Sequence, residues 1–552
     1  MPDSLVPKTV SVFTEGYDGA RLKADAFAGL TVAIVALPLS MAIAIASGVT
    51  PDRGLYTAIV GGFLVSLLGG SRVQIGGPAG AFIVLVAATG SRHGLDGLLL
   101  ATAMSGVMLV AAGYLRLGNY IKFIPYPVTV GFTAGIAVII FASQLRDLFG
   151  LTLSGREPGP IIEKLATLGL AVGTVSWAAV LTAALTIGLI LVLRKLRPHW
   201  PGMLIAVTAA SAFVALLQLP AETIGTRFGG IPRGLPSPAL PPFSLEKAAA
   251  VFPDAVSFAL LGAIESLLSA VVADGMTGRR HRSSMELIAQ GIANFCSALF
   301  GGICVTGTIA RTATNVRAGG TSPVSGMLHS LFLLLFMFLA APLASYIPLA
   351  ALAGVLAVVA WNMIEKPAFM ALMRSSYGDA VVLLATFIIV VFRELTEGIV
   401  IGFALGAVLF IDRMAKSISV GETKPLEALK EENGEEEHPV VADDPDTVIY
   451  RISGIFFFGS AATVGTVLDR IADQRRNFIL DCSEVPFMDS TAANVIEGTL
   501  RKAERTGVRF FITGARSQVR RTLRQHDVRP PRVVMRASVQ AALKSIRNEK
   551  GE

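Results

Sequence analysis

Long apolar runs, separated by short polar stretches, fill most of the chain between residues 28 and 412. Runs of about 20 apolar residues with few charges are typical of helices that cross a lipid bilayer. Two of the fourteen runs, 78–90 and 308–317, are shorter and predict half-helices. The runs are 28–47, 53–69, 78–90, 95–115, 125–145, 170–193, 202–218, 254–273, 285–301, 308–317, 323–341, 346–361, 378–392 and 396–412.

The loops between these runs carry Lys and Arg mainly at alternate exits. With residues 1–24 in the cytoplasm, the basic exits fall on the cytoplasmic side, so both termini are expected there. The transmembrane domain, 25–415, then divides into two repeats of seven segments, about 25–218 and about 253–415. An odd number of crossings per repeat gives the two repeats opposite orientation, which predicts an inverted repeat.

Composition supports a polytopic membrane protein. The chain has 552 residues, 53% hydrophobic and 16% charged, with a mean hydropathy of +0.63, which is too apolar for a soluble protein of this length. We therefore expect the cytoplasmic (inner) membrane and contact with its lipids. The formal charge of +7 lies in short loops and is a topology signal, so no nucleic-acid partner is expected.

Nothing in the sequence indicates an enzyme or a bound cofactor. Cys296, Cys304 and Cys482 lack the spacing of metal ligands, and no disulfide framework is implied. The stretch Gly459 to Gly465 is not a phosphate loop, because it has no Lys.

Two charged residues lie inside apolar runs. Glu265 is in the middle of one run, and Arg311 follows the Gly- and Thr-rich break GGICVTGT. A half-helix that starts near Thr308 would direct its unpaired N–H groups and its positive dipole end into the membrane, with Arg311 one turn in. This arrangement predicts an anion site.

A second copy of the break lies about 230 residues earlier. The stretch 66–82 aligns with 298–313 after a two-residue gap, so that Gly77 matches Gly307 and Ala81 falls opposite Arg311. Pro78 is expected in the first helical turn, where its missing N–H is not needed. Paired broken segments in corresponding halves indicate a transporter binding site, although glycine-rich turns could match by chance in a chain with 55 Gly. The nearby Glu265 and Arg311 favour the binding site.

Each charged residue has a second interpretation. Glu265, with Ser269 one turn away, is a candidate coupling site for a proton or a sodium ion, or it is a structural partner of Arg311. Arg311 is an anion ligand, or it extends toward the membrane surface as a topology signal. Ionisable groups inside the membrane are functional by default, which favours the first interpretation of each.

After the last run the sequence becomes polar. Residues 416–445 are an acidic stretch expected to be a linker, and residues 446–552 alternate strand and helix patterns as in a small α/β domain. Ser490, between a strand and a helix, is either a regulatory phosphorylation site or the N-cap of the helix, and the N-cap is the favoured reading.

The first apolar run, QIGGPAG, FIPYPVTVGFTAGIA, GTIARTATN and MDSTAA together resemble the SulP (sulfate permease) family of anion transporters with a C-terminal STAS domain. The resemblance covers residues 20 to 547. It implies fourteen segments in two inverted repeats with two half-helices, a mobile core domain (segments 1–4 and 8–11), a gate domain (segments 5–7 and 12–14), a cytosolic tail and a homodimer. Among bacterial members the chain is similar to the branch for C4-dicarboxylate uptake.

The resemblance also implies a set of site residues. The first segment would line the pocket with Leu39 and Ser40, and Leu39 stands where several relatives have a polar or acidic residue, which makes Glu265 the stronger coupling candidate. Backbone donors would come from Gly77, Ala79, Gly80, Ala81, Gly307, Thr308, Ile309, Ala310 and Arg311.

We therefore expect a secondary active transporter of a small anion (sulfate, C4-dicarboxylate or bicarbonate), coupled to protons or sodium. The alternatives are a membrane anion sensor, which signals through the STAS domain to a cytosolic partner, and an anion channel.

Overall fold

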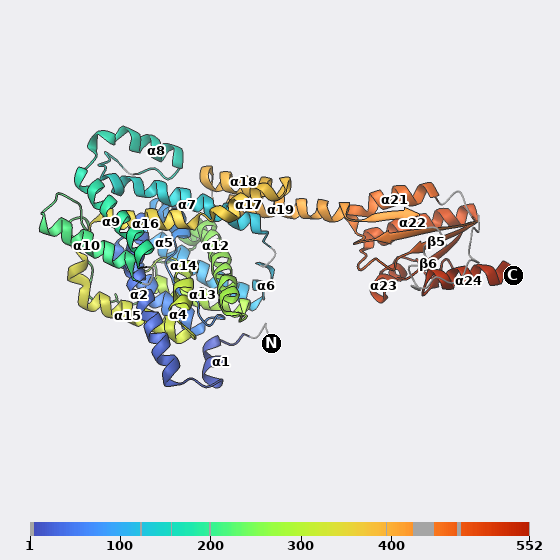
Figure 1. Cartoon of the computed structure of the whole chain (residues 1–552), viewed down its shortest axis with the longest axis horizontal. Helices are drawn as coiled ribbons and strands as arrows, with labels where there is room; N and C mark the ends of the chain where they lie inside the picture. Colours follow the sequence, from blue (N-terminus) through green and yellow to red (C-terminus); the bar gives the residue numbers. More distant parts are fainter. Residues whose placement is uncertain are drawn as a thin grey trace. The chain divides into compact units, whose positions relative to one another are not determined.

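The computed structural model shows two compact units, Met1–Ala404 and Leu405–Glu552 (Figure 1). The first unit is almost entirely helical, and the second combines a sheet with helices. The residues that the structure describes are 5–121, 124–155, 157–197, 200–393, 395–422, 446–471 and 476–550.

The first half of the helical unit ends in a long loop after a short helix. Its elements are α1 (Lys8–Thr14), α2 (Gly19–Ala46), α3 (Pro51–Tyr56), the π-helical turn η1 (Thr57–Gly61), α4 (Gly62–Leu68), β1 (Gly76–Gly77), the 3₁₀ turn η2 (Gly80–Phe82), α5 (Ile83–Tyr114), α6 (Gly118–Ile121), α7 (Tyr126–Phe149), α8 (Ile161–Leu170), η3 (Val172–Thr174), α9 (Trp177–Leu196), α10 (Gly202–Leu216) and α11 (Ile224–Phe228).

The second half repeats the pattern of long helices interrupted by one short strand. Its elements are α12 (Leu245–Thr277), α13 (Ser283–Leu299), β2 (Thr306–Gly307), α14 (Ile309–Arg317), α15 (Pro323–Ala344), α16 (Leu349–Met363), α17 (Lys366–Ser375), α18 (Tyr377–Phe392) and α19 (Leu395–Lys416).

A helix lies over each apolar run of the sequence. Within the described ranges, eight helices are long and apolar enough to cross a membrane. The runs 78–90 and 95–115 are continuous in η2 and α5, but Gly94 inside α5 has a non-helical backbone (φ 66°, ψ −173°) that separates them. The chain is thus a helical membrane protein, whereas fourteen crossings stay a prediction.

The helices form two packing groups. In one group α5 packs against α12 and α13, and α2 packs along α15. In the other, α7 packs against α16 and α18, while α9 packs against α10 and α16. The two groups meet mainly where α2 contacts α10 and α16.

Close backbone approach fixes the crossing of α5 and α13. A Cβ added at Gly106 would lie 2.6 Å from the carbonyl oxygen of Gly291, and a Cβ at Gly291 would lie 2.5 Å from that of Gly106. Small residues at a crossing allow two membrane helices to come this close, so any side chain at either position would push them apart.

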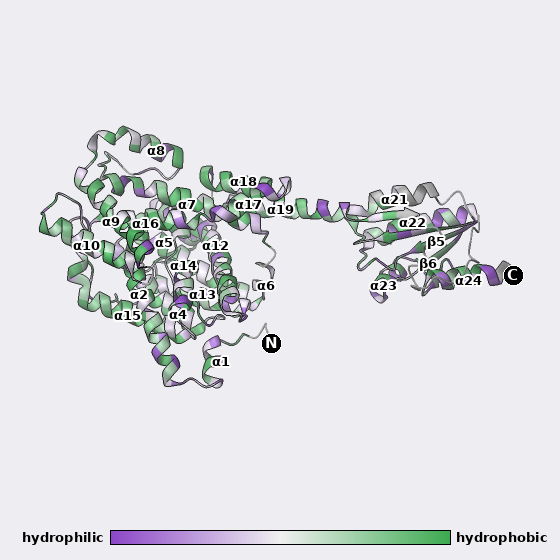
Figure 2. Ribbon diagram, viewed as in Figure 1, coloured by the Kyte–Doolittle hydropathy of each residue, from purple (hydrophilic) through white to green (hydrophobic). Residues whose placement is uncertain are grey.

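Hydrophobic residues cover the surface of the helical unit as well as its interior (Figure 2). Leu170, Leu216, Leu245 and Leu343 are among the large apolar side chains that are mostly exposed. An apolar exterior of this extent is stable in lipid rather than in water.

The second unit contains a five-stranded sheet with the order β3-β4-β5-β6-β7. Strand β3 is antiparallel to β4, and the other neighbours are parallel. Its elements are β3 (Ser419–Glu422), β4 (Thr447–Ser453), α21 (Phe458–Ile471), β5 (Asn477–Asp481), α22 (Ser490–Thr506), β6 (Arg509–Thr513), α23 (Ser517–Gln525), β7 (Val534–Arg536) and α24 (Val539–Lys550).

Alternating side chains of the strands bury both faces of this sheet. Phe478, Leu480 and Phe510 pack in a core with α21, α22 and α23, whereas Ile479 and Phe511 pack in a separate core with α24. The period of two along each strand assigns neighbouring residues to opposite faces, which produces the three layers.

Two details of this unit differ from expectation. Strand β3 lies at 419–422, inside the stretch expected to be linker from 416, and residues 423–445 of that stretch lie outside the described residues. The N-cap of α22 is Asp489, whose carboxylate accepts a hydrogen bond from the N–H of Ala492 at 2.9 Å, so the N-cap role expected for Ser490 was wrong. Ser490 is the exposed first residue of the helix.

Candidate functional site

The two glycine-rich breaks lie side by side. Strands β1 and β2 pair antiparallel, with Gly76 opposite Gly307 and Gly77 opposite Thr306, and the N–H of Thr308 donates to the carbonyl of Ile75 at 3.0 Å. The register is symmetric: if residues 76 and 77 change places with residues 306 and 307, the same two pairs result. Two segments about 230 residues apart are therefore joined by backbone hydrogen bonds in a symmetric register.

Arg311 lies in the first turn of the helix that follows β2. Thr308 is the N-cap residue of α14, which begins at Ile309, and the Arg311 side chain is only 2% exposed. Its Nη2 donates to Ser40 Oγ at 3.1 Å and to the carbonyl of Pro78 at 3.3 Å. Within the described residues its Nε and Nη1 atoms have no hydrogen-bond partner. A buried cation with unpaired donors is unstable unless an acceptor is supplied, so this geometry favours a bound anion.

Gly77 allows the guanidinium to occupy this place. A Cβ added at Gly77 would lie 1.8 Å from Nη1 of Arg311, so only glycine leaves room for the side chain. Gly307 has the corresponding role on the other strand, where a Cβ would lie 1.6 Å from Nε2 of Gln74. Gly77 and Gly307 thus each face a polar side chain, whereas Gly76 faces Val65 of α4.

The first break differs from the expected half-helix. Ala79 is the N-cap residue of the 3₁₀ turn η2, and Pro78 lies before it in extended chain, so its expected place in the first helical turn was wrong. Ala79 and Ala81 are buried, while Gly80 is half-buried beside Ile140 of α7 and Met363 of α16. The start of this segment therefore lies where the two packing groups meet.

The start of α14 is more open. Ile309 and Ala310 are exposed, although Thr308 and Arg311 are buried on either side of them. The first N–H groups of a helix have no partner within it, so the start of α14, where Arg311 lies in the first turn, is a candidate source of backbone donors.

Helix α12 is hydrogen-bonded to the second break and to the helix that follows it. Ser269 Oγ donates to Thr312 Oγ1 at 3.2 Å, and that oxygen also accepts the N–H of Ile75 at 3.1 Å. Thr306 Oγ1 donates to the carbonyl of Gly262 at 3.2 Å. Ser269, the predicted coupling residue, is therefore bonded to the helix that carries Arg311.

Glu265 lies one turn before Ser269 on the same helix and is half-buried. Among the described residues its carboxylate has no hydrogen-bond or ion-pair partner, so the interpretation of Glu265 as a structural partner of Arg311 was wrong. An ionisable side chain inside a membrane-spanning helix is costly, which keeps Glu265 a candidate for the predicted coupling site.

The predicted pocket residues of α2 have different surroundings. Ser40 is fully buried and accepts the hydrogen bond from Arg311, whereas Leu39 is 7% exposed within the apolar core. Sequence reasoning grouped the two, but only Ser40 contacts a charged group.

A buried carboxylate that the sequence analysis did not select lies beneath the first break. Glu286 of α13 is fully buried, and its Oε2 accepts the N–H groups of Gly70 at 2.8 Å and Ser71 at 3.1 Å. Its Oε1 accepts bonds from Ser266 at 3.4 Å and Gln290 at 3.2 Å. Glu286 lies near the start of an apolar run, where an acidic residue is common at the end of a helix, so the sequence analysis did not select it.

His329 of α15 was also missed, although it lies inside the apolar run 323–341 and is fully buried. An ionisable residue inside an apolar run is the signal that would have found it.

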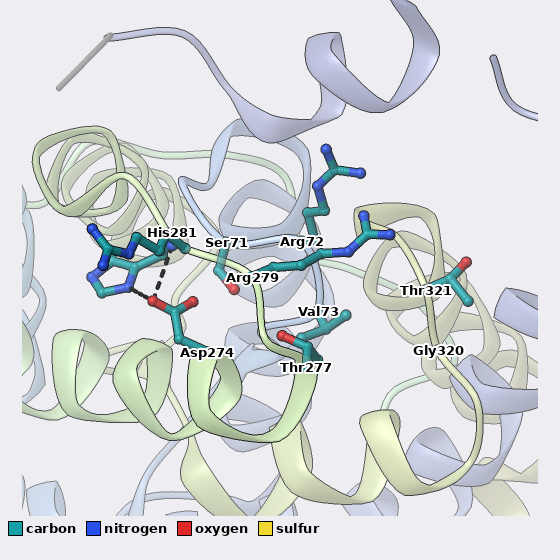
Figure 3. Close-up of a pocket in the computed structure, with 10 residues that line it drawn as sticks. Ser71, Arg72, Val73, Asp274, Thr277, Arg279, His281, Gly320 and Thr321 are labelled. Atoms are coloured by element: carbon teal, nitrogen blue, oxygen red, sulfur yellow. Dashed lines mark hydrogen bonds and ion pairs between the residues drawn. The ribbon is translucent and has the colours of Figure 1, made fainter. Parts of the chain in front are cut away.

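A separate cavity of about 230 Å³ is lined by the chain after α4, the C-terminal end of α12, the loop that follows α12 and the loop that follows α14 (Figure 3). His281 Nδ1 and Asp274 Oδ2 are 2.7 Å apart on its wall, and Arg72 pairs with Glu15 of α1's C-terminal end, a bond that lowers the pKa of the Glu15 carboxyl. The cavity does not include Arg311 or Glu265. Its lining is Ser71, Arg72, Val73, Asp274, Thr277, Arg279, Arg280, His281, Gly320 and Thr321.

Comparison with known families agrees with this architecture. Residues 22–386 match the model of the sulfate permease family, and residues 438–542 match that of the STAS domain. The chain belongs to the sulfate permease family. The resemblance derived from its motifs, including the C-terminal STAS domain, is confirmed.

Similar proteins align with this sulfate permease family member over nearly its whole length. It is 41% identical to "Putative sulfate transporter YvdB" of Bacillus subtilis (strain 168), covering 92% of this chain and 94% of that protein. It is 31% identical to "Bicarbonate transporter BicA" of Synechocystis sp. (strain ATCC 27184 / PCC 6803 / Kazusa), covering 92% and 91%. The structure of SLC26A9 has the same fold, with a TM-score of 0.85 at 17% identity over 99% of this chain and 93% of that one.

These relatives are named as transporters, so the chain is a membrane transport protein and not an enzyme, as predicted.

Proposed function

We propose that the chain is a secondary active transporter of a small anion, with Arg311 as the principal ligand of that anion. The observation that carries this proposal is the buried guanidinium between the two paired breaks, two of whose nitrogen atoms lack partners among the described residues. The remaining ligands are backbone N–H groups at Gly77, Ala79, Gly80, Ala81, Gly307, Ile309, Ala310 and Arg311, whereas the N–H of Thr308 is bonded to the carbonyl of Ile75. Ser40 orients the guanidinium by accepting one of its hydrogen bonds.

The donor set suits charge and size more than chemical identity, because one guanidinium and several N–H groups bind any compact oxyanion. Sulfate and bicarbonate are the candidates that the names of similar proteins support. A C4-dicarboxylate remains a candidate from the subfamily resemblance alone.

Coupling to a proton or a sodium ion is assigned to Glu265 and Ser269. The support is the half-buried, unpaired carboxylate of Glu265 and the bond from Ser269 to Thr312, which links α12 to the residue next to Arg311. Carboxylate and hydroxyl oxygens are suitable ligands for a sodium ion, and the same carboxylate can carry a proton. A cation or proton bound at Glu265 and Ser269 would therefore affect α14, the helix that carries Arg311.

Alternating access would move the group formed by α2–α5 and α12–α15 against the group formed by α7, α9, α10, α16, α18 and α19. The symmetric ladder of β1 and β2 and the helix order support fourteen segments in two inverted repeats. In this account the protein is a homodimer in the cytoplasmic membrane with both termini inside the cell, and the STAS domain is available to a cytosolic partner through the exposed Ser490.

Uptake into proteoliposomes tests the proposal. Labelled sulfate, bicarbonate, succinate and fumarate are offered with and without inward proton and sodium gradients. We expect one anion to accumulate only with a gradient, and Glu265→Gln to remove that gradient dependence while Glu246→Gln, at the exposed start of α12, retains it.

Other outcomes favour the alternatives. Binding to the purified protein without any flux would support an anion sensor. Flux that follows the anion's own gradient without saturation would support a channel.

A further inference from the structure

The cavity at the C-terminal end of α12 lies where membrane helices begin and end. Its lining comes from the chain after α4, from α12 and the loop after it, and from the loop before α15. Helices α12 and α15 are both long and apolar enough to cross a membrane; α12 ends at Thr277 and α15 begins at Pro323. Thr321 of the cavity is also bonded to Asp25, in the second turn of the membrane helix α2. The cavity is therefore at the level of the lipid headgroups.

This cavity has more positive charge than its acids balance. The two acids beside it, Glu15 and Asp274, are each already paired with a cation. Arg279 and Arg280 of the lining form no ion pair with any residue in the described ranges. Figure 3 shows the Arg279 side chain extending away from Asp274 and toward Thr321. Two arginines without acids at one small cavity attract an anion.

Lys8 of α1 adds a further positive charge beside the cavity. Its N–H donates to the carbonyl of Gly69 at 2.9 Å, and burial, followed by repulsion from Arg282 and Arg72, lowers the pKa of its amine. Cations this close together oppose one another until an anion neutralises them. A topology signal requires only positive charge in a loop, and neither the cavity nor the mostly buried Arg72 side chain, 13% exposed, is explained by it.

The size and the donors of the cavity suit a phosphate group. Pockets that hold a whole organic ligand have volumes of about 300–1,000 Å³. This cavity, with about 230 Å³, suits a smaller group. Guanidinium groups bind phosphate oxygens in pairs, and the hydroxyl of Ser71 on the wall is a further donor. A phosphate group therefore fits better than a nucleotide.

The helix beside the cavity presents apolar side chains outward. The C-terminal end of α1 is held at the cavity by Glu15. Val10 and Phe13, three residues apart on α1, are 49% and 55% exposed, whereas Val12 is buried. A short amphipathic helix at the ends of membrane helices is suited to the boundary between headgroups and acyl chains. A lipid whose headgroup occupied the cavity would have apolar surface next to its acyl chains.

We propose that this cavity binds the phosphate group of an anionic lipid of the surrounding membrane. Arg279 and Arg280 are its charged ligands, and Val10 and Phe13 contact the acyl chains. Basic pockets between membrane helices are suited to such headgroups. Soluble phosphate offers the same group without acyl chains, so the apolar face of α1 favours the lipid. The site is separate from the proposed anion site, because the cavity does not include Arg311.

Lipid binding to the purified full-length protein tests this inference. The protein in a neutral detergent is titrated with phosphatidylglycerol or with phosphatidylcholine, and native mass spectrometry counts the bound lipids. We expect the first phosphatidylglycerol to bind at least about tenfold more tightly than phosphatidylcholine. Phosphatidylglycerol should also raise the unfolding temperature more than phosphatidylcholine does, because the ligand binds the folded protein.

Four variants locate the lipid. The double variant Arg279→Gln with Arg280→Gln should bind the two lipids within about twofold of each other, whereas Arg279→Lys with Arg280→Lys should retain most of the preference. Arg233→Gln with Arg374→Gln removes two exposed positive charges elsewhere and should behave as wild type. Val10→Ser should weaken phosphatidylglycerol binding, and a thermal unfolding scan without lipid checks the folding of each variant.

Several results would overturn the inference. They are equal binding of both lipids by the wild-type protein, and a preference that persists in Arg279→Gln with Arg280→Gln or disappears in the control pair. Inorganic phosphate that displaces phosphatidylglycerol at equal concentration would identify a soluble anion as the ligand and reject the lipid. Arg311→Gln should retain the preference; its loss there would show that the two sites are not separate.

Discussion

Arg311 and Gly77 constrain each other at the scale of single residues. The guanidinium can lie against β1 only because residue 77 has no side chain, and its bonds to Ser40 and Pro78 hold it there while Nε and Nη1 stay unpaired. A buried cation held by neutral groups and left partly unsatisfied is the basis for proposing an anion site here rather than a structural ion pair. Substitutions that move the guanidinium should therefore affect binding before they affect folding.

Gly77→Ala should weaken anion binding by at least about tenfold, or about 1.4 kcal/mol, because the new methyl group must displace Nη1 from 1.8 Å. Labelled sulfate binding measures the effect. Gly188→Ala on α9 is the matched control, since a Cβ there meets no atom within 4 Å. Equal affinity of Gly77→Ala and wild type would contradict the assigned position of Arg311.

At the scale of elements, the buried carboxylate of Glu286 joins α13 to the end of α4. Its two bonds to the N–H groups of Gly70 and Ser71 fix the chain just before β1, and so fix where the first break begins. Hydrogen bonds to a charged acceptor contribute more than neutral ones, and their loss leaves buried donors unpaired.

Glu286→Ala should lower the stability of the protein by about 2–3 kcal/mol or more, from two charge-assisted hydrogen bonds. Glu286→Gln, which retains one carbonyl oxygen as acceptor, should lower it less. Thermal unfolding and protease resistance in detergent measure both, with Glu246→Ala at the exposed start of α12 as the control. An unchanged unfolding temperature in Glu286→Ala would show that the bonds do not hold the break.

In the STAS domain the cap of α22 gives a second test of an element. Asp489→Ala should cost about 1 kcal/mol, because its carboxylate accepts the N–H groups of both Ala492 and Phe458. Hydrogen exchange at these two N–H groups should accelerate in Asp489→Ala and stay unchanged in Ser490→Ala. Faster exchange in Ser490→Ala together with unchanged exchange in Asp489→Ala would instead identify Ser490 as the cap.

The elements also show how far the sequence alone leads. Apolar runs and the break before Arg311 predicted a helix start near Thr308, where the structure has the N-cap of α14, because such signals are local. The sequence analysis favoured Ser490 as the cap, and the structure has the adjacent Asp489, a residue type that caps helices equally well. Glu286 was missed because its role depends on partners from distant segments, and strand β3 because four residues give little pattern. His329 had a local signal, an ionisable residue inside an apolar run, that the sequence analysis did not use.

At the scale of the whole molecule, the residues of the proposed anion site lie in the unit Met1–Ala404, and the STAS sheet lies in the other unit. Strand β3 lies within the stretch 416–445 that was expected to be linker, but it belongs to the STAS sheet, where it pairs with β4. A truncation that separates the two units must therefore end before β3.

A chain that ends at Lys416 should retain sulfate binding within about twofold, a difference of about 0.4 kcal/mol. A chain that ends between β3 and β4 leaves β3 without its partner strand, and we expect it to aggregate more. Gel filtration and labelled sulfate binding compare the two. Loss of binding in the chain that ends at Lys416 would show that the STAS domain is part of the site.

The most direct test of the account is sulfate binding by Arg311→Gln. Arg317→Gln is the control, because it removes the same charge from an exposed position in the last turn of the same helix. We predict that Arg311→Gln remains folded and loses at least about thirtyfold in affinity, or about 2 kcal/mol, while Arg317→Gln binds as wild type. Equal binding by Arg311→Gln and wild type would contradict the central claim that the paired breaks hold an arginine as the anion ligand.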